Sequence, residues 1–102
     1  MTVYLTKMAG SCYEDRWESD TGIFSTMGKA LEEFESIKKM YEIGTKQLEE
    51  HYLDKEWTNE MEFAHSYPEW DWFEICEYEI DDGCKEQHVW ELEKGEWHEL
   101  GN

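Results

Sequence analysis

The segment EWDWFEICEYEIDD, residues 69–82, combines seven carboxylates with four aromatic rings and contains no lysine or arginine. Its second half alternates between apolar and acidic residues, which is typical of a β-strand with one buried face. We therefore expect a strand whose apolar set faces a helix and whose acidic set faces water or a partner. The apolar set is Cys76, Tyr78 and Ile80, and the acidic set is Glu77, Glu79 and Asp81.

The start of the same strand does not keep this phase. Trp70, Trp72 and Phe73 cannot all lie on one face of a regular strand, because neighbouring side chains alternate. We therefore expect a β-bulge or an exposed aromatic side chain at this point.

The remaining C-terminal sequence continues the β pattern. The turn signal DDG, residues 81–83, is followed by alternation through EQHVWELEKGEWHEL, residues 86–100, with a second turn at EKGE, residues 93–96. Residues 70–100 are therefore predicted to form a three-stranded antiparallel meander.

The N-terminal half predicts a hairpin followed by a helix. TVYLTKM, residues 2–8, and RWESDTGIFS, residues 16–25, read as two strands, the second interrupted or bulged around residues 20–22. Residues 25–44 have helical apolar spacing, with Ser25 or Thr26 as the N-cap and Gly44 at the C-terminal end. A short second helix is expected over residues 45–53 and irregular structure over residues 54–71.

These elements together predict an α+β fold. An antiparallel sheet, made of the N-terminal hairpin plus the C-terminal meander, carries one main helix on one face. With 102 residues, the chain is expected to form a single domain over residues 1–102.

The net charge of −17 is unevenly distributed. Residues 1–55 have a net charge of −4, whereas residues 56–102 have fifteen acidic residues and only Lys85 and Lys94 as bases. Such a surface should not bind nucleic acid or an anionic membrane directly. Its expected partners are basic protein surfaces or cations.

The three cysteines are expected to be free thiols in a cytoplasmic protein. MTVYLTKMAG, residues 1–10, lacks the long apolar run of a signal peptide, and no apolar stretch approaches the length of a membrane span. Cys76, Cys84, His88 and His98 are metal-ligating residue types, but their spacing matches no standard zinc motif. We therefore predict no metal and no cofactor.

Part of the chain resembles small, uncharacterised phage and bacterial domains. The matching stretches are residues 3–6, 22–30 and 75–82, similar to VYVL, GVFST..KA and I.EYELDE motifs. The resemblance implies a ββαββ-like fold and a phage origin, and it implies no activity. The size and acidity also resemble those of phage anti-restriction and anti-CRISPR inhibitors that mimic DNA.

The acidic C-terminal half therefore suggests a protein inhibitor. Seventeen net negative charges equal the phosphate charge of about eight or nine base pairs, so the chain could occupy the basic groove of a nucleic-acid-handling host protein. The alternative for the acidic face is a solvated surface without a partner. The predicted partner-binding residues are Glu69, Trp70, Asp71, Glu74, Glu77, Glu79, Asp81, Asp82, Glu86, Glu91 and Glu93.

Other functional classes have less support. The chain contains no P-loop, GxGxxG, GxSxG or HExxH motif, and pairs of carboxylates occur by chance among twenty-six, so an enzyme is not predicted. A small structural or assembly subunit that docks through its sheet edge is the alternative function. An exposed edge would also allow a homodimer.

The tryptophans have two interpretations. Trp72, Tyr78 and Trp90 are expected in the core, because the chain has few aliphatic residues to fill it. For Trp57, Trp70 and Trp97 both interpretations remain open, a core position or an anchor for a basic partner.

Overall fold

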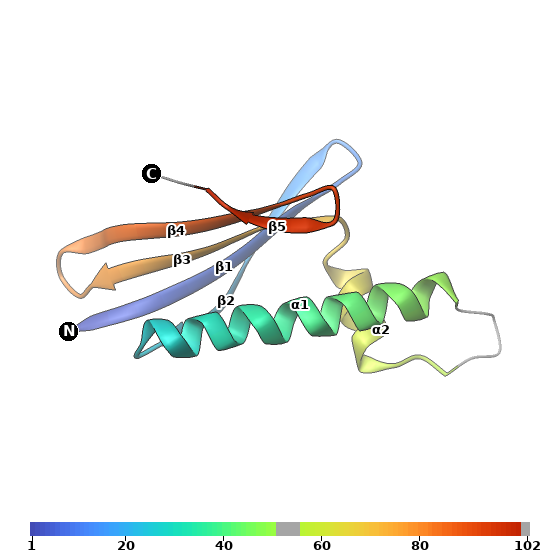
Figure 1. Cartoon of the computed structure of the whole chain (residues 1–102), viewed down its shortest axis with the longest axis horizontal. Coiled ribbons are helices and arrows are strands. Elements are labelled where there is room, and N and C mark those ends of the chain that lie inside the picture. The colour runs from blue at the N-terminus through green and yellow to red at the C-terminus, as the bar shows by residue number, and fades with distance from the viewer. Residues whose placement is uncertain (51–55, 101–102) are drawn as a thin grey trace.

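Five antiparallel strands form one sheet in the computed structural model, which describes residues 1–50 and 56–100 (Figure 1). The strand order is β2-β1-β3-β4-β5, so the N-terminal hairpin and the C-terminal meander join through the β1–β3 pair. The elements in chain order are β1 (Thr2–Cys12), β2 (Asp15–Phe24), α1 (Met27–Glu49), α2 (Asn59–Ser66), β3 (Trp70–Glu79), β4 (Gly83–Glu93) and β5 (Glu96–Glu99). The predicted α+β fold is confirmed.

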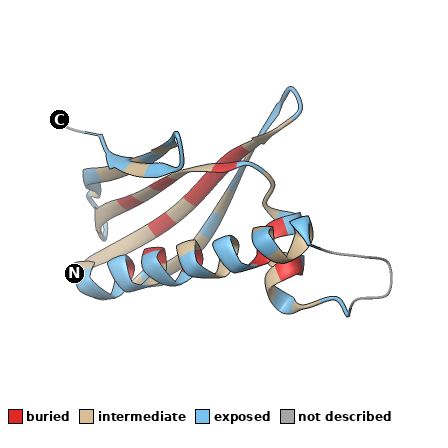
Figure 2. Ribbon diagram, turned by 45° about the vertical axis from the view of Figure 1, so that its right-hand side comes forward, coloured by how far each residue is buried: buried red, intermediate tan, exposed pale blue. Residues whose placement is uncertain are grey.

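Helix α1 packs on one face of this sheet and buries the main core (Figure 2). Phe34 of α1 stacks on Phe73 of β3, with ring centroids 4.2 Å apart. Trp70 lies against the same ring, while Trp90 and Trp97 reach it from β4 and β5. Each fully buried large apolar side chain contributes about 1.5–3 kcal/mol to the stability of the fold. Because this chain has few aliphatic residues, aromatic rings supply this burial.

Two bulges determine which side chains reach the core. Thr6 pairs with Gly22 and Lys7 with Asp20, so Thr21 is the extra residue in β2. Ala9 pairs with Trp72 and Gly10 with Trp70, so Asp71 is the extra residue in β3. In each place a bulge was one of two predicted alternatives, and the register shows the bulge in both.

The bulge at Asp71 lies at the start of β3, whose buried face is the opposite of the predicted one. It brings Trp70 into phase with Phe73 and Ile75, and these three side chains are buried beneath α1. Cys76 and Tyr78 therefore lie on the opposite side of the sheet, and Ile80 is exposed after the strand ends. Glu77 and Glu79 share the side that α1 covers, so the predicted assignment of the apolar and acidic sets is wrong.

Helix α1 begins where the sequence predicts and extends further. The Thr26 side chain caps the helix by accepting a hydrogen bond of 3.1 Å from the backbone N–H of Lys29. The predicted end at Gly44 is wrong, because α1 continues to Glu49. The short helix expected over residues 45–53 is the end of α1 over residues 45–49, and residues 51–53 lie outside the described part.

Gly44 permits the close approach of α2. A Cβ atom at this position would lie 1.9 Å from the carbonyl oxygen of Glu60. Helix α2 was not predicted, since residues 54–71 were expected to be irregular. Its signals are the N-cap Thr58 and the buried pair Met61 and Ala64, which are spaced three residues apart.

Cys76 and Cys84 form a disulfide between β3 and β4, with their Cα atoms 6.0 Å apart. The expectation of three free thiols is therefore wrong, and Cys12 is the free cysteine. Cysteine usage no longer supports a reducing compartment for this chain.

Candidate functional site

Both helices lie on one side of the sheet, and among the described residues no element covers the other side, here called the open face (Figure 1). The register of β1 with β3 places the following side chains on the open face: Val3, Leu5, Lys7, Ala9, Trp72, Glu74, Cys76 and Tyr78. The open face is therefore a mixed surface of apolar, aromatic and charged groups.

The predicted partner-binding residues do not share one surface. Glu74 of β3 and Glu91 and Glu93 of β4 lie on the open face. Register places Glu77, Glu79 and Glu86 on the helix side of the sheet. The turn between β3 and β4 carries Asp81 and Asp82, and the start of β3 carries Glu69, Trp70 and Asp71.

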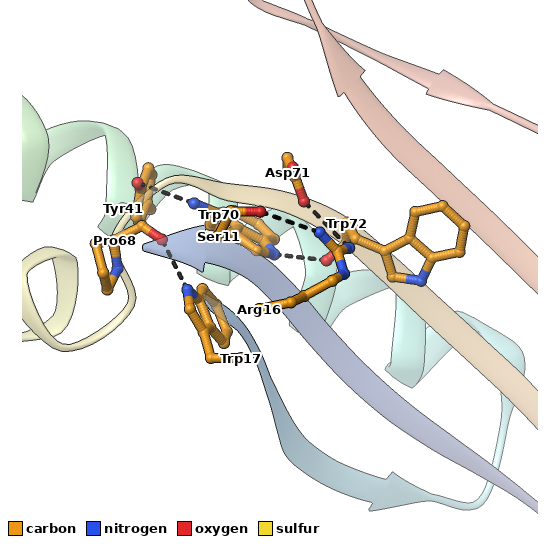
Figure 3. A network of polar contacts seen from close by, with 8 residues as sticks. All are labelled: Ser11, Arg16, Trp17, Tyr41, Pro68, Trp70, Asp71 and Trp72. Atoms are coloured by element: carbon orange, nitrogen blue, oxygen red, sulfur yellow. Dashed lines mark hydrogen bonds and ion pairs between the residues drawn. The ribbon is translucent and has the colours of Figure 1, made fainter. Parts of the chain in front are cut away.

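Trp70 is 2% exposed, so a partner cannot reach it in this structure. Its backbone N–H donates to the Tyr41 hydroxyl at 3.2 Å, and its indole N–H donates to the Trp72 carbonyl at 2.8 Å (Figure 3). Trp90 and Trp97 also pack against Phe34, which places them with the core. Trp57 is 45% exposed and donates to Glu62 at 2.7 Å.

An acidic groove crosses the open face and has a volume of about 410 Å³. Ala9 of β1 pairs with Glu18 on one side and with Trp72 on the other, so the strand register places these two groove residues on either side of β1. The side chains that line the groove are Arg16, Glu18, Asp71, Trp72, Glu74 and Glu91. They come from β2, β3 and β4, which the β1 strand and the bulge at Asp71 bring together.

Arg16 occupies part of this groove. Its guanidinium carbon lies 6.0 Å from the Trp72 ring centroid, and its Nη2 lies 3.3 Å from Asp71 Oδ1 (Figure 3). That oxygen is shielded from solvent and accepts no hydrogen bond, because the contact with Arg16 has ion-pair distance but not hydrogen-bond geometry. The groove thus presents an aromatic ring and an unsatisfied carboxylate oxygen to a guanidinium group.

Most acidic groups of the C-terminal half form no ion pair with a basic group among the described residues. Of the fifteen acidic residues after residue 55, two form ion pairs with a lysine, an arginine or the N-terminal ammonium among the described residues, which leaves thirteen. These two are Asp71, paired with Arg16, and Glu79, paired with the N-terminal ammonium at 2.6 Å. The hydrogen bond from that ammonium, followed by one from Thr2, lowers the pKa of Glu79.

Sequence reasoning missed Arg16 and Glu18 as site residues and assigned Trp72 to the core. The first two are separated from β3 by more than fifty residues, so only the sheet order brings them to the groove. One signal in the sequence was available, since Trp72 and Phe73 are consecutive strand residues and therefore face opposite sides of the sheet.

Comparisons with protein-family models, with curated proteins and with solved structures found no match for this chain. Within residues 1–50 and 56–100, neither helix has the length and apolar character that crossing a membrane requires.

Proposed function

We propose that this chain is a non-enzymatic, phage-encoded inhibitor that binds a basic, nucleic-acid-handling protein in the host cytoplasm by imitating the charge of nucleic acid. Anti-CRISPR or anti-restriction activity is the proposed biological role. The observation that carries the proposal is that thirteen acidic residues of the C-terminal half form no ion pair with a lysine, an arginine or the N-terminal ammonium within the described residues.

The shape of the molecule supports this proposal quantitatively. The chain is 51 Å long and 25 and 22 Å across, and its net charge is −17. Asp54 and Lys55, which lie outside the described residues, cancel each other. One net charge therefore falls on about every 3 Å of length, which is close to the spacing of about 3.4 Å along one strand of DNA and about half the charge density of the duplex, one charge per about 1.7 Å.

The groove on the open face supplies a means of specific contact. Carboxylates attract a basic surface over long range, whereas an aromatic ring stacks beneath an arginine at short range. Trp72 lies among Glu18, Glu74 and Glu91, and one guanidinium group, that of Arg16, already lies over its ring at 6.0 Å from the centroid. We therefore place the centre of the proposed interface at this groove.

The test is capture of host proteins on the immobilised chain at low and high salt, with duplex DNA as competitor. The proposal expects basic, nucleic-acid-binding proteins, released both by several hundred millimolar salt and by DNA. Capture that neither salt nor DNA reduces would contradict mimicry.

A structural subunit that docks through the sheet edge is the second candidate. Strand β2 is ten residues long and forms one edge of the sheet, and its Ile23 is 70% exposed. An unpaired strand edge can accept a strand from another chain. Proline substitutions along β2 would abolish binding through this edge and leave binding through the groove intact.

A further inference from the structure

Three metal-ligating side chains meet on the helix side of the β3–β4 pair. Glu77 of β3 lies directly opposite Glu86 of β4, and His88 follows two residues later on the same face of β4. One ligand atom from each residue lies within 4.8 Å of the other two. The His88 Nε2 and a Glu86 oxygen are 3.9 Å apart.

The two carboxylates of this cluster lack a compensating cation. Like charges directly opposite each other on neighbouring strands are destabilising. No lysine or arginine among the described residues forms an ion pair with Glu77 or Glu86, although Lys85 is adjacent in sequence. The half-buried positions of Glu77 and His88 reduce the water available to screen the charge.

The ligand set and its geometry fit a transition-metal ion. Imidazole favours zinc and its neighbours over calcium and magnesium, which prefer oxygen ligands alone. Two ligands of a tetrahedral zinc ion lie about 3.3 Å apart, given metal–ligand distances of about 2.0–2.1 Å. Small side-chain rotations would close the present separations, because the Glu86 side chain is 52% exposed and free to move.

We propose that Glu77, Glu86 and His88 form a binding site for a divalent transition-metal ion such as Zn²⁺. Three protein ligands leave the fourth tetrahedral position to water. Bound there, the ion would neutralise the opposed carboxylates and fasten β3 to β4. This site shares only His88 with the Cys76, Cys84, His88 and His98 set, because the disulfide holds both cysteines on the open face.

The test is titration of the untagged, full-length chain with Zn²⁺ in the absence of a reductant, followed by calorimetry and by the imidazole signals of His88. One Zn²⁺ should bind per chain, and an equal concentration of Ca²⁺ or Mg²⁺ should not displace it. Glu77→Gln and His88→Ala should each weaken binding at least about tenfold, because loss of an outer partner alone usually costs about 10–100-fold.

His98→Ala is the matched control. His98 also lies beside a glutamate, with its Nε2 4.0 Å from a Glu96 oxygen, but it is not part of the trio. Its loss should leave Zn²⁺ affinity unchanged. The proposal is overturned if the chain binds no Zn²⁺, if Ca²⁺ competes equally, or if His98→Ala weakens binding as much as His88→Ala. Circular dichroism of each variant excludes unfolding as the cause.

Discussion

The Arg16 guanidinium group lies over the Trp72 ring, 6.0 Å from its centroid, with Asp71 on its other side. The chain thus carries, on its own strands, the contact that the proposed function requires of a partner. An arginine from the partner could reach the same ring and carboxylate only by displacing Arg16 or sharing the groove with it.

Removal of Arg16 should therefore strengthen binding to the basic partner. Arg16→Ala opens the groove, and an exposed cation–π contact of about 0.5–1 kcal/mol corresponds to roughly two- to fivefold in affinity. Lys29→Ala on α1 makes the same change in net charge far from the groove and serves as the control. Calorimetry with the captured partner measures both, and equal affinities for the two variants would contradict the assignment.

Loss of the Trp72 ring should weaken binding. Trp72→Ala removes the aromatic anchor of the groove, and truncation of such an anchor costs about 2 kcal/mol, or roughly 30-fold in affinity. Tyr13→Ala is the control, because Tyr13 is 98% exposed in the turn between β1 and β2. Denaturation of each variant shows whether the fold persists, and an unchanged affinity in a folded Trp72→Ala protein would move the interface elsewhere.

Two glycines in α1 should respond oppositely to alanine. Gly44→Ala would force its new Cβ into the Glu60 carbonyl, so a loss of about 1–3 kcal/mol in unfolding free energy is expected. Gly28→Ala meets only the Thr26 hydroxyl oxygen, at 3.9 Å, and should stabilise the protein by up to about 1 kcal/mol. Urea denaturation measures both, and a neutral Gly44→Ala would show that α1 and α2 can separate at little cost.

The stability contribution of Glu79 should depend on pH. Its pKa is lowered in the folded chain by the N-terminal ammonium and by Thr2. A lowered folded-state pKa stabilises the fold above the ordinary unfolded value, about 4.3, and this contribution is lost as the pH falls through the lowered pKa. Glu79→Gln should therefore have a lower urea midpoint than the natural chain at pH 7, and the difference between the two midpoints should be smaller at pH 3. A difference independent of pH would show that the ion pair contributes nothing.

The sequence predicted the strands, the irregularities at Thr21 and Asp71 and the start of α1, because alternation, turn residues and caps are local signals, whereas the third bulge, at Lys85 of β4, was not predicted. The faces of β3 were assigned incorrectly for a physical reason. Alternation shows that two sets of side chains exist, but which set is buried depends on packing against the helix, where Phe34 stacks on Phe73. Gly44 misled the prediction in a similar way, since a glycine that permits close helix packing resembles one that ends a helix.

The candidate site was predictable only in part. Glu74 and Glu91 were predicted from the charge pattern and do line the groove. Arg16 and Glu18 reach it through the β2-β1-β3 strand order, which no local pattern specifies. The Glu77, Glu86 and His88 cluster likewise depends on the β3–β4 register, because the bulge at Lys85 sets which residues face each other.

The salt dependence of partner affinity tests the central claim most directly. Two triple variants are compared. The groove variant changes Glu18, Glu74 and Glu91 to lysine and so reverses the charge at the groove. The α1 variant makes the same change in net charge at exposed positions of α1, where Glu32, Glu42 and Glu49 are changed to lysine. We predict that affinity for the captured partner falls steeply with salt in the natural chain. The groove variant should bind far more weakly and with a shallower salt slope than the α1 variant. Equal affinities and equal slopes for the two variants would contradict mimicry centred on the groove.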